Sequence, residues 1–177
     1  MIEPIKRSGF PLPPRGWPLV ALLDVFILAS LIGHDPWKND DAVTIGVVAD
    51  MLQRGHWLAP HLADRPYPDA PLYYWSAAVT GFAFSWLLPL HDAIRLASGF
   101  WVALILFLLY RAGREWHCNE EAPHEFAIAS VLAMAGCLGF LVHAHEAQPM
   151  LVALAGHAAA YWALALLPRK PQRAAII

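Results

Sequence analysis

The strongest constraint on this chain is a set of four apolar segments, each long enough to cross a lipid bilayer. The hydrocarbon core of a bilayer is about 30 Å thick, and a helix needs about 17 to 25 residues to span it. The four segments are residues 17–33, 94–110, 126–142 and 149–167. With 58% hydrophobic and 15% charged residues, the chain has more apolar side chains than 177 residues can bury in one core. We therefore predict an all-α integral membrane protein with a single membrane domain and four transmembrane helices.

A fifth apolar segment, residues 71–90, has a composition suited to the membrane surface. Its aromatic residues favour the headgroup zone: Tyr73, Tyr74, Trp75, Phe82, Phe84 and Trp86. If this segment lies in the interface, the chain crosses the membrane four times and both termini share a compartment. If it spans, there are five crossings.

The lysine and arginine residues favour four crossings with both termini in the cytoplasm, because basic residues collect in cytoplasmic segments near the ends of membrane helices. Eight basic residues are then cytoplasmic: Lys6, Arg7, Arg15, Arg111, Arg114, Arg169, Lys170 and Arg173. Four lie outside: Lys38, Arg54, Arg65 and Arg95. The predicted cytoplasmic segments are the tail 1–16, the loop 111–125 and the tail 168–177. The predicted extracytoplasmic segments are 34–93 and 143–148.

The long extracytoplasmic segment contains a predicted amphipathic helix over residues 40–54. Apolar residues recur there at spacings of three and four, and Gly55 ends the pattern. Asp40 and Asp41 occupy the first turn, where the positive end of the helix dipole favours carboxylates. They either stabilise the helix start or serve in catalysis.

Other polar residues in the two extracytoplasmic segments are candidate ligand contacts. Arg65 lies in a proline-rich loop and suits a phosphate headgroup, although a single loop arginine is often only solvated. Four histidines of these segments, His56, His61, His143 and His145, are candidate metal ligands. Histidine and a nearby acid such as Glu146 are ligand types suited to zinc. A metal-binding membrane protein is therefore a third hypothesis. No basic patch indicates a nucleic-acid partner.

Several short patterns occur in a fixed order between residues 30 and 155. They are Asp40-Asp41, then Met51-Leu52-Gln53-Arg54-Gly55-His56-Trp57-Leu58-Ala59-Pro60, Tyr67, Ala70-Pro71, Tyr74-Trp75, Arg95-Leu96 and Gln148-Pro149-Met150. In this order the chain resembles the membrane glycosyltransferases of the aminoarabinose transferase and protein O-mannosyltransferase type, which are glycosyltransferase family 39-like and have the GT-C fold. The resemblance implies a GT-C-like N-terminal module, with one or two interfacial helices, at residues 40–54 and 71–90, in its first extracytoplasmic loop.

The resemblance also implies a function and a set of site residues. Such an enzyme transfers a sugar from a polyprenyl-phosphate donor to an acceptor at the extracytoplasmic face, here of a bacterial inner membrane. The candidate catalytic residues are Asp40, Asp41 and Glu146, and the candidate substrate-binding residues are Arg65, Tyr67, Tyr74, Arg95 and Gln148. A carboxylate there acts as a general base or holds a divalent metal against the phosphate. Expected partners are membrane lipid, the lipid-linked sugar and a partner subunit.

The chain departs from the family pattern at two positions and in length. Ala70 replaces a lysine, which removes a cation, and Gln148 replaces an acid, which removes a base. Glu146 can substitute for that acid only if it lies in the loop before the helix. Family members continue through more membrane helices, so we expect this chain to correspond to an N-terminal part. The alternative function is a non-catalytic membrane protein that binds lipid or a partner subunit through the same module.

Overall fold

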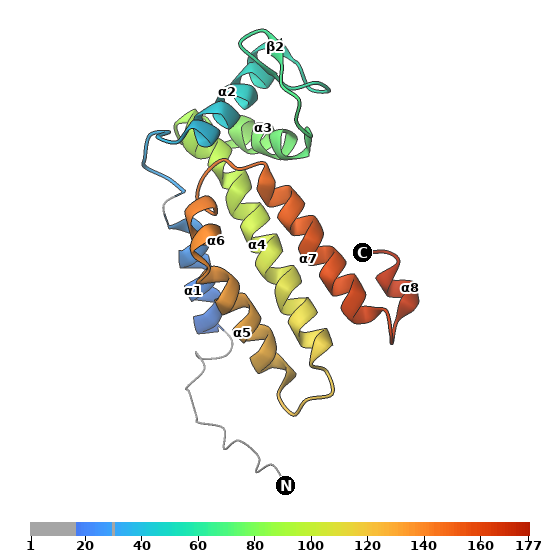
Figure 1. The fold of residues 1–177 in the computed structure, drawn as a ribbon. Coiled ribbons are helices and arrows are strands. Elements are labelled where there is room, and N and C mark those ends of the chain that lie inside the picture. Colours follow the sequence, from blue (N-terminus) through green and yellow to red (C-terminus); the bar gives the residue numbers. More distant parts are fainter. Residues whose placement is uncertain (1–16, 30) are drawn as a thin grey trace.

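The computed structural model describes residues 17–29 and 31–177 and is mainly helical (Figure 1). The predicted tail 1–16 lies outside the described residues. In chain order the elements are α1 (Trp17–Leu28), α2 (Asn39–Arg54), β1 (His61–Leu62), β2 (Arg65–Pro66), α3 (Leu72–Phe84), α4 (Leu90–Trp116), α5 (Pro123–Ala135), α6 (Leu138–His143), α7 (Met150–Leu166) and α8 (Pro171–Ala174). This order confirms the predicted helical architecture, apart from one short hairpin.

Helix α4 is the central element, and α3, α5 and α7 all pack against it (Figure 1). Among the described helices, α4 is long and apolar enough to cross a membrane, and the shorter helices Pro18–Leu28 and Met150–Leu166 are also apolar. These three helices are compatible with an all-α membrane protein. The number of crossings stays a prediction, because α1 and α7 are shorter than a typical span.

The predicted continuous helix over residues 126–142 is divided into α5 and α6. Helix α5 ends at Ala135, the N–H of Gly136 closes the last turn on the carbonyl of Leu132, and α6 starts at Leu138. Glycine costs about 1 kcal/mol relative to alanine inside a helix, which makes Gly136 a weak point. Hydropathy could not show this division, because the residues on both sides are apolar.

Helices α2 and α3 and the hairpin form a cap over one end of the bundle that contains α4, α5 and α7 (Figure 1). Helix α2 begins one residue before the predicted start and ends at Arg54, where Gly55 adopts a left-handed conformation with φ of 78°. Its apolar face, which includes Val47, Val48 and Met51, packs against Tyr73, Tyr74 and Ala77 of α3. The antiparallel hairpin, which turns at Ala63 and Asp64 with positive φ, was not predicted.

The two ends of the helical bundle are different. The start of α1 and the end of α7 lie opposite the cap, while the loop between α6 and α7 lies directly beneath it (Figure 1). This arrangement suits the predicted four-crossing topology, and it brings residues from four distant parts of the chain together under α2.

Candidate functional site

The first turn of α2 sends its two acids in different directions. Successive residues of an α-helix are about 100° apart, so adjacent side chains do not share a face. Asp40 is exposed and lines an open pocket together with Thr44, which lies one turn further along α2. Asp41 is 0% exposed and points into the protein. The acidic pair therefore occupies two separate environments.

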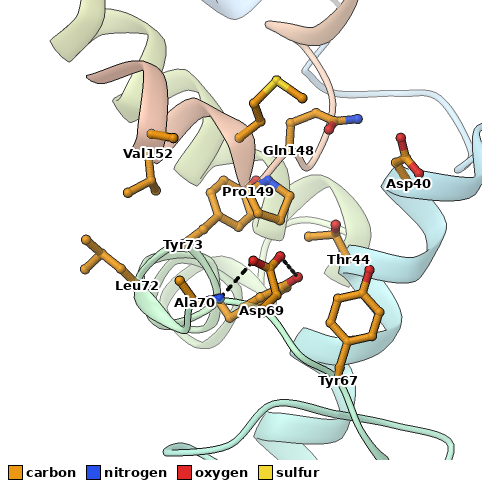
Figure 2. A pocket seen from close by; sticks show the side chains of 13 residues that line it. Asp40, Thr44, Tyr67, Asp69, Ala70, Leu72, Tyr73, Gln148, Pro149 and Val152 are labelled. Carbon is orange, nitrogen blue, oxygen red and sulfur yellow. Dashed lines mark hydrogen bonds between the residues drawn. The ribbon is translucent and has the colours of Figure 1, made fainter. Parts of the chain in front are cut away.

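The pocket beside Asp40 has a volume of about 530 Å³ and lies between α2, α3 and the start of α7 (Figure 2). Its lining residues are Asp40, Thr44, Tyr67, Asp69, Ala70, Leu72, Tyr73, Tyr74, Gln148, Pro149, Met150, Val152 and Ala153. It thus brings together four of the predicted site residues: Asp40, Tyr67, Tyr74 and Gln148. Ala70 also lines it, so the position at which the family has a lysine faces this pocket.

Asp69 is a pocket residue that the sequence did not single out as a site residue. One carboxylate oxygen accepts the backbone N–H of Ala70 at 2.8 Å, and the other accepts the hydroxyl of Tyr74 at 2.9 Å. Burial, followed by this hydrogen bond to Asp69, raises the pKa of the Tyr74 phenol far above its usual range, so the phenol stays protonated and donates. Tyr67 meets the Tyr74 ring edge to face at 6.4 Å. Together these contacts fix the position of Asp69.

Tyr73 forms the inner wall of the pocket and connects it to the loop before α7. Its hydroxyl lies 2.6 Å from Ser98 Oγ, and Ser98 Oγ donates to the carbonyl of Glu146 at 2.5 Å. Because Ser98 has one proton, Tyr73 is the donor to Ser98. Burial raises the pKa of the Tyr73 phenol, which keeps that proton in place.

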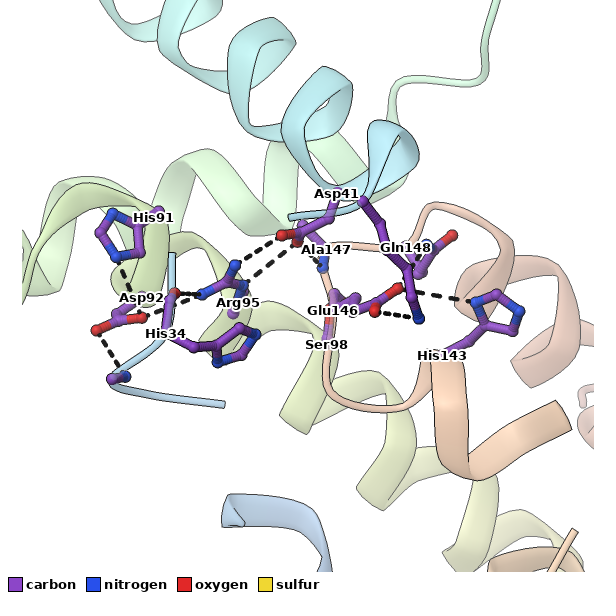
Figure 3. A network of polar contacts seen from close by, with 12 residues as sticks. His34, Asp41, His91, Asp92, Arg95, Ser98, His143, Glu146, Ala147 and Gln148 are labelled. Carbon is purple, nitrogen blue, oxygen red and sulfur yellow. Dashed lines mark hydrogen bonds and ion pairs between the residues drawn. The ribbon is translucent and has the colours of Figure 1, made fainter. Parts of the chain in front are cut away.

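Beneath the pocket, Arg95 is the centre of a buried polar network (Figure 3). The Arg95 side chain is 0% exposed and binds both oxygens of Asp41, at 2.6 and 3.3 Å. It also donates to the carbonyl of His34 at 2.6 Å and to Asp92 at 3.2 Å. Asp41 accepts a further hydrogen bond of 2.8 Å from the backbone N–H of Ala147. Arg95 therefore joins α4 to α2 and to the chain before it, and Asp41 joins α2 to the loop before α7.

Glu146 lies in the loop before α7, as its proposed substitution for the missing acid requires. The residue is 4% exposed, and its carboxylate binds Lys38 at 2.5 Å and the Gln148 amide at 3.3 Å. It does not line the pocket beside Asp40. Instead it lines a separate pocket with His34, Trp37 and Lys38.

The structure does not bring the remaining predicted site residues to the pocket. Arg65 lies on β2 and is exposed, whereas Arg95 and Asp41 are enclosed by the network. Of the candidate metal ligands, His56 and His61 have ring centroids 4.2 Å apart near the hairpin, and His145 binds the carbonyl of Phe26 at 2.6 Å. Across residues 17–29 and 31–177, no group of three or more His, Cys, Asp or Glu side chains forms a metal-ligand set.

Comparison with known proteins shows similarity to bacterial sugar transferases over part of the chain. Proteins named undecaprenyl phosphate-alpha-4-amino-4-deoxy-L-arabinose arabinosyl transferase match it in several organisms. The one from Photorhabdus laumondii is 33% identical over 107 residues, which cover 59% of this chain and 19% of the relative. The one from Pectobacterium atrosepticum is 33% identical over 94 residues, covering 52% of this chain and 16% of the relative.

These matches confirm the predicted resemblance to the N-terminal part of this type of transferase. The chain spans about a fifth of the length of the curated relatives that it matches. No family model matches the chain, and no solved structure does.

Proposed function

We propose that the chain forms part of the catalytic region of a membrane glycosyltransferase that transfers a sugar from a polyprenyl-phosphate donor to an acceptor. The main support is the pocket beside Asp40. It collects four of the residues that the resemblance assigned to the site, from α2, from the loop before α3, from α3 and from the loop before α7. The names of the relatives supply the class of donor, an undecaprenyl-phosphate-linked aminosugar.

Asp40 is the general base in this proposal. Its carboxylate accepts the proton of an acceptor hydroxyl while that oxygen bonds to the anomeric carbon of the sugar. The bond between the anomeric carbon and the phosphate oxygen breaks, its electron pair leaves with polyprenyl phosphate, and the proton passes from Asp40 to water. The Asp40 side chain forms no hydrogen bond or ion pair with the described residues, so its carboxylate is free to accept the proton.

The other pocket residues position the sugar. Tyr67 offers a half-buried ring surface for the apolar face of a sugar, and the enclosed ring of Tyr74 packs edge to face against it. Asp69 adds a second carboxylate, and no Lys, Arg or His is among the described residues that line the pocket. A pocket with two carboxylates and aromatic walls favours a neutral or amine-bearing sugar over an anionic one.

Among the described residues no group of three or more His, Cys, Asp or Glu side chains forms a ready-made metal site, and no step in this proposal uses a metal. Asp40 and Asp69 are the carboxylates on the pocket wall, and Asp69 already accepts two hydrogen bonds from Ala70 and Tyr74. Ca²⁺ takes six to eight oxygen ligands, whereas Mg²⁺ keeps several waters beside one or two carboxylates and substrate phosphates, so these two carboxylates alone do not complete the ligand shell of either ion.

Asp41, Arg95 and Glu146 have a positioning role in this proposal. Both oxygens of Asp41 are bound to Arg95, and one also binds the loop before α7, so Asp41 holds the first turn of α2 against that loop. Asp40 is the next residue along the helix. The network therefore sets the direction in which Asp40 enters the pocket.

The experiment is a transfer assay on membranes that contain the protein, with a radiolabelled aminosugar on undecaprenyl phosphate. We expect Asp40→Asn to reduce transfer by about 10²- to 10⁴-fold, the usual contribution of general acid–base catalysis. The matched control is Asp35→Asn, which removes an exposed carboxylate outside the pocket. An unchanged rate in Asp40→Asn refutes the assignment. A wild-type protein that binds the donor without turnover supports the non-catalytic alternative.

We also propose that the cap lies outside a bacterial inner membrane and that both termini lie in the cytoplasm. In a Cys137→Ala background, a cysteine placed at Ser85, just after α3, should react with an impermeant thiol reagent added to intact cells. Cys118, in the turn between α4 and α5 at the opposite end, should react only after the cells are opened. Labelling of Cys118 in intact cells contradicts this orientation.

A further inference from the structure

The apolar part of the bundle carries one acid and one base on its outer surface. Four stretches of the described helices form this part: residues 17–28, 96–110, 126–135 and 150–166. Their acidic and basic residues are Asp24 on α1 and His157 on α7, and both side chains are exposed. An ionisable side chain within a membrane segment is costly in lipid and almost always faces a polar partner. Each of these two residues therefore requires a partner.

The fold keeps the acid and the base apart within one copy of the chain. Asp24 forms no hydrogen bond or ion pair with the described residues. His157 Nδ1 donates to the carbonyl of Ala153 at 2.7 Å, which leaves Nε2 of the neutral ring as an acceptor. Helix α1 lies to the left of α4 and α7 to its right, so the two residues face different sides of the bundle (Figure 1). A partner for either one must come from outside that copy.

The two residues lie at a similar depth, measured from the end of the bundle opposite the cap. Asp24 follows Trp17, the first residue of α1, by seven residues, or about 10 Å. His157 precedes Leu166, the last residue of α7, by nine residues, or about 14 Å. Helix α1 runs toward the cap and α7 runs away from it (Figure 1). Two copies in the same membrane orientation can therefore place α1 antiparallel to α7, with acid and base less than one helical turn apart in depth.

An apolar groove beside Asp24 offers room for another helix. Near the cap α1 packs tightly on α4, since a methyl group added at Gly99 would lie 2.8 Å from Leu31 Cδ1. Further from the cap, α1, α4 and α5 enclose a groove of about 590 Å³, and Asp24 lies on its wall. The other lining residues are mainly apolar. In this groove the carboxyl group of Asp24 is thus accessible from the lipid side.

The outer face of α7 is complementary to this groove. Tyr161 and Leu164 follow His157 by one and two turns and are 47% and 57% exposed. With His157 beside Asp24 in the antiparallel arrangement, these two side chains reach the end of the groove that is further from the cap. Gly156 is also exposed, and a small residue at this place lets a second helix approach closely. Charge, depth and shape therefore agree on the same pair of surfaces.

We propose that α7 of one copy docks in the groove beside α1 of a second copy, where His157 pairs with Asp24. The carboxyl group and Nε2 share one proton, as a neutral hydrogen bond or as an ion pair. Because the two surfaces of the contact differ, it is heterologous and repeats from copy to copy around an axis normal to the membrane. Neither residue lines the pocket beside Asp40, so this association does not depend on the catalytic assignment.

Disulfide cross-linking between two differently tagged copies tests the contact in membranes. Cys118 and Cys137 are first replaced by alanine. Val20 and Ala160 are exposed and lie one turn further from the cap than the acid and the base, so the pair itself stays intact. We expect Val20→Cys in one copy to cross-link to Ala160→Cys in the other when the membranes are oxidised with copper phenanthroline.

The control for chance collisions is a cysteine on a different helix at the same depth. Ala129 is exposed on α5 and lies six residues from its first residue, and Ala160 lies six residues from the last residue of α7. Val20→Cys should therefore give about tenfold less product with Ala129→Cys than with Ala160→Cys. Equal product with both overturns the proposal.

Substitution of the pair tests whether it holds the copies together. Asp24→Leu and His157→Leu should each lower the cross-linked fraction about tenfold, the size expected for one polar contact between membrane helices. Both side chains are exposed, so the melting temperatures should equal that of the wild type. The exchanged chain, with Asp24→His and His157→Asp together, should recover the cross-link. A cross-linked fraction that is unchanged in Asp24→Leu overturns the pairing.

Discussion

The pocket and the buried network use the same kinds of residue in opposite ways. In the pocket, Asp40 is exposed and unpaired among the described residues, and Asp69 accepts only local hydrogen bonds. In the network, Asp41 and Arg95 are fully enclosed, and Asp41 binds groups from two other segments. The charge of a side chain therefore does not indicate its role here. What differs is whether the hydrogen-bonding atoms of the side chain are already paired with other groups of the protein.

The largest expected effect is the loss of stability when the network loses its cation. Arg95→Met leaves Asp41 as a buried carboxylate without a counter-charge and leaves Asp92 with only His91 beside it, which should reduce the free energy of unfolding by about 3–5 kcal/mol. Titration of the purified protein with SDS, followed by tryptophan fluorescence, measures this. The control Arg65→Met removes an exposed arginine and should stay within about 0.5 kcal/mol of the wild type. Equal stability of the two variants contradicts a stabilising role for the network.

A second prediction separates the adjacent acids in the first turn of α2. Asp41→Asn weakens the charge-assisted bonds to Arg95 and should cost about 1.5–3 kcal/mol. Asp40→Asn loses only the favourable interaction with the helix dipole, about 0.3–1 kcal/mol. The same SDS titration compares the two variants directly. If Asp40→Asn is the less stable of the two, the division into pocket and network is wrong.

The third prediction concerns Tyr73, which forms the inner wall of the pocket. Its ionisation should make the stability of the protein depend on pH. Burial raises the pKa of Tyr73 above the value of about 10 in an unfolded chain, so the folded state favours the neutral phenol. Its contribution is complete below pH 10 and declines as pH rises above 10, because only the unfolded chain then ionises readily.

Melting curves between pH 8 and pH 11 measure this decline. Tyr73→Phe cannot ionise, so its curve should fall less steeply over the same range, although at pH 8 it lacks a hydrogen bond worth about 1 kcal/mol. A wild-type curve parallel to that of the variant contradicts the assignment to Tyr73.

The smallest expected effect concerns Arg65, a predicted substrate contact that the structure leaves on the exposed hairpin. Arg65→Ala should change the rate of sugar transfer by no more than about twofold, since an exposed arginine away from the pocket contributes little. The transfer assay described for Asp40 measures it. A loss of tenfold or more would show that the hairpin reaches the substrate.

Local sequence patterns predicted the elements that local interactions determine. The spacing of Val47, Val48 and Met51, with Gly55 after them, predicted the helix that the structure has over Asn39–Arg54. The length of an apolar run predicted one membrane helix over residues 126–142, where the chain in fact leaves the helix at Gly136 and starts another at Leu138. A single glycine within an apolar run changes hydropathy very little, although it changes the backbone.

The composition of the site depends on tertiary contacts that spacing does not contain. Which of two adjacent acids is exposed is set by how α2 docks, and the partner of Asp41 at Ala147 lies 106 residues away. Asp69 could have been recognised from its position just before α3, beside Ala70 and near Tyr74. The pairing of Lys38 with Glu146 had no signal in the sequence, because the two residues lie in distant segments of the chain that only the fold brings together.

The bonds to Asp41 also set an order of events during synthesis. Arg95 follows Asp41 by 54 residues, so the ion pair can form once α4 is made, whereas Ala147 follows Asp41 by 106 residues. At about 5–20 residues per second, the ribosome needs roughly 3–10 s to pass from one partner to the other. During that interval Asp41 is available to neutralise Arg95 while α5 and α6 are still being made. The pocket wall is thus the last part of this region to be completed.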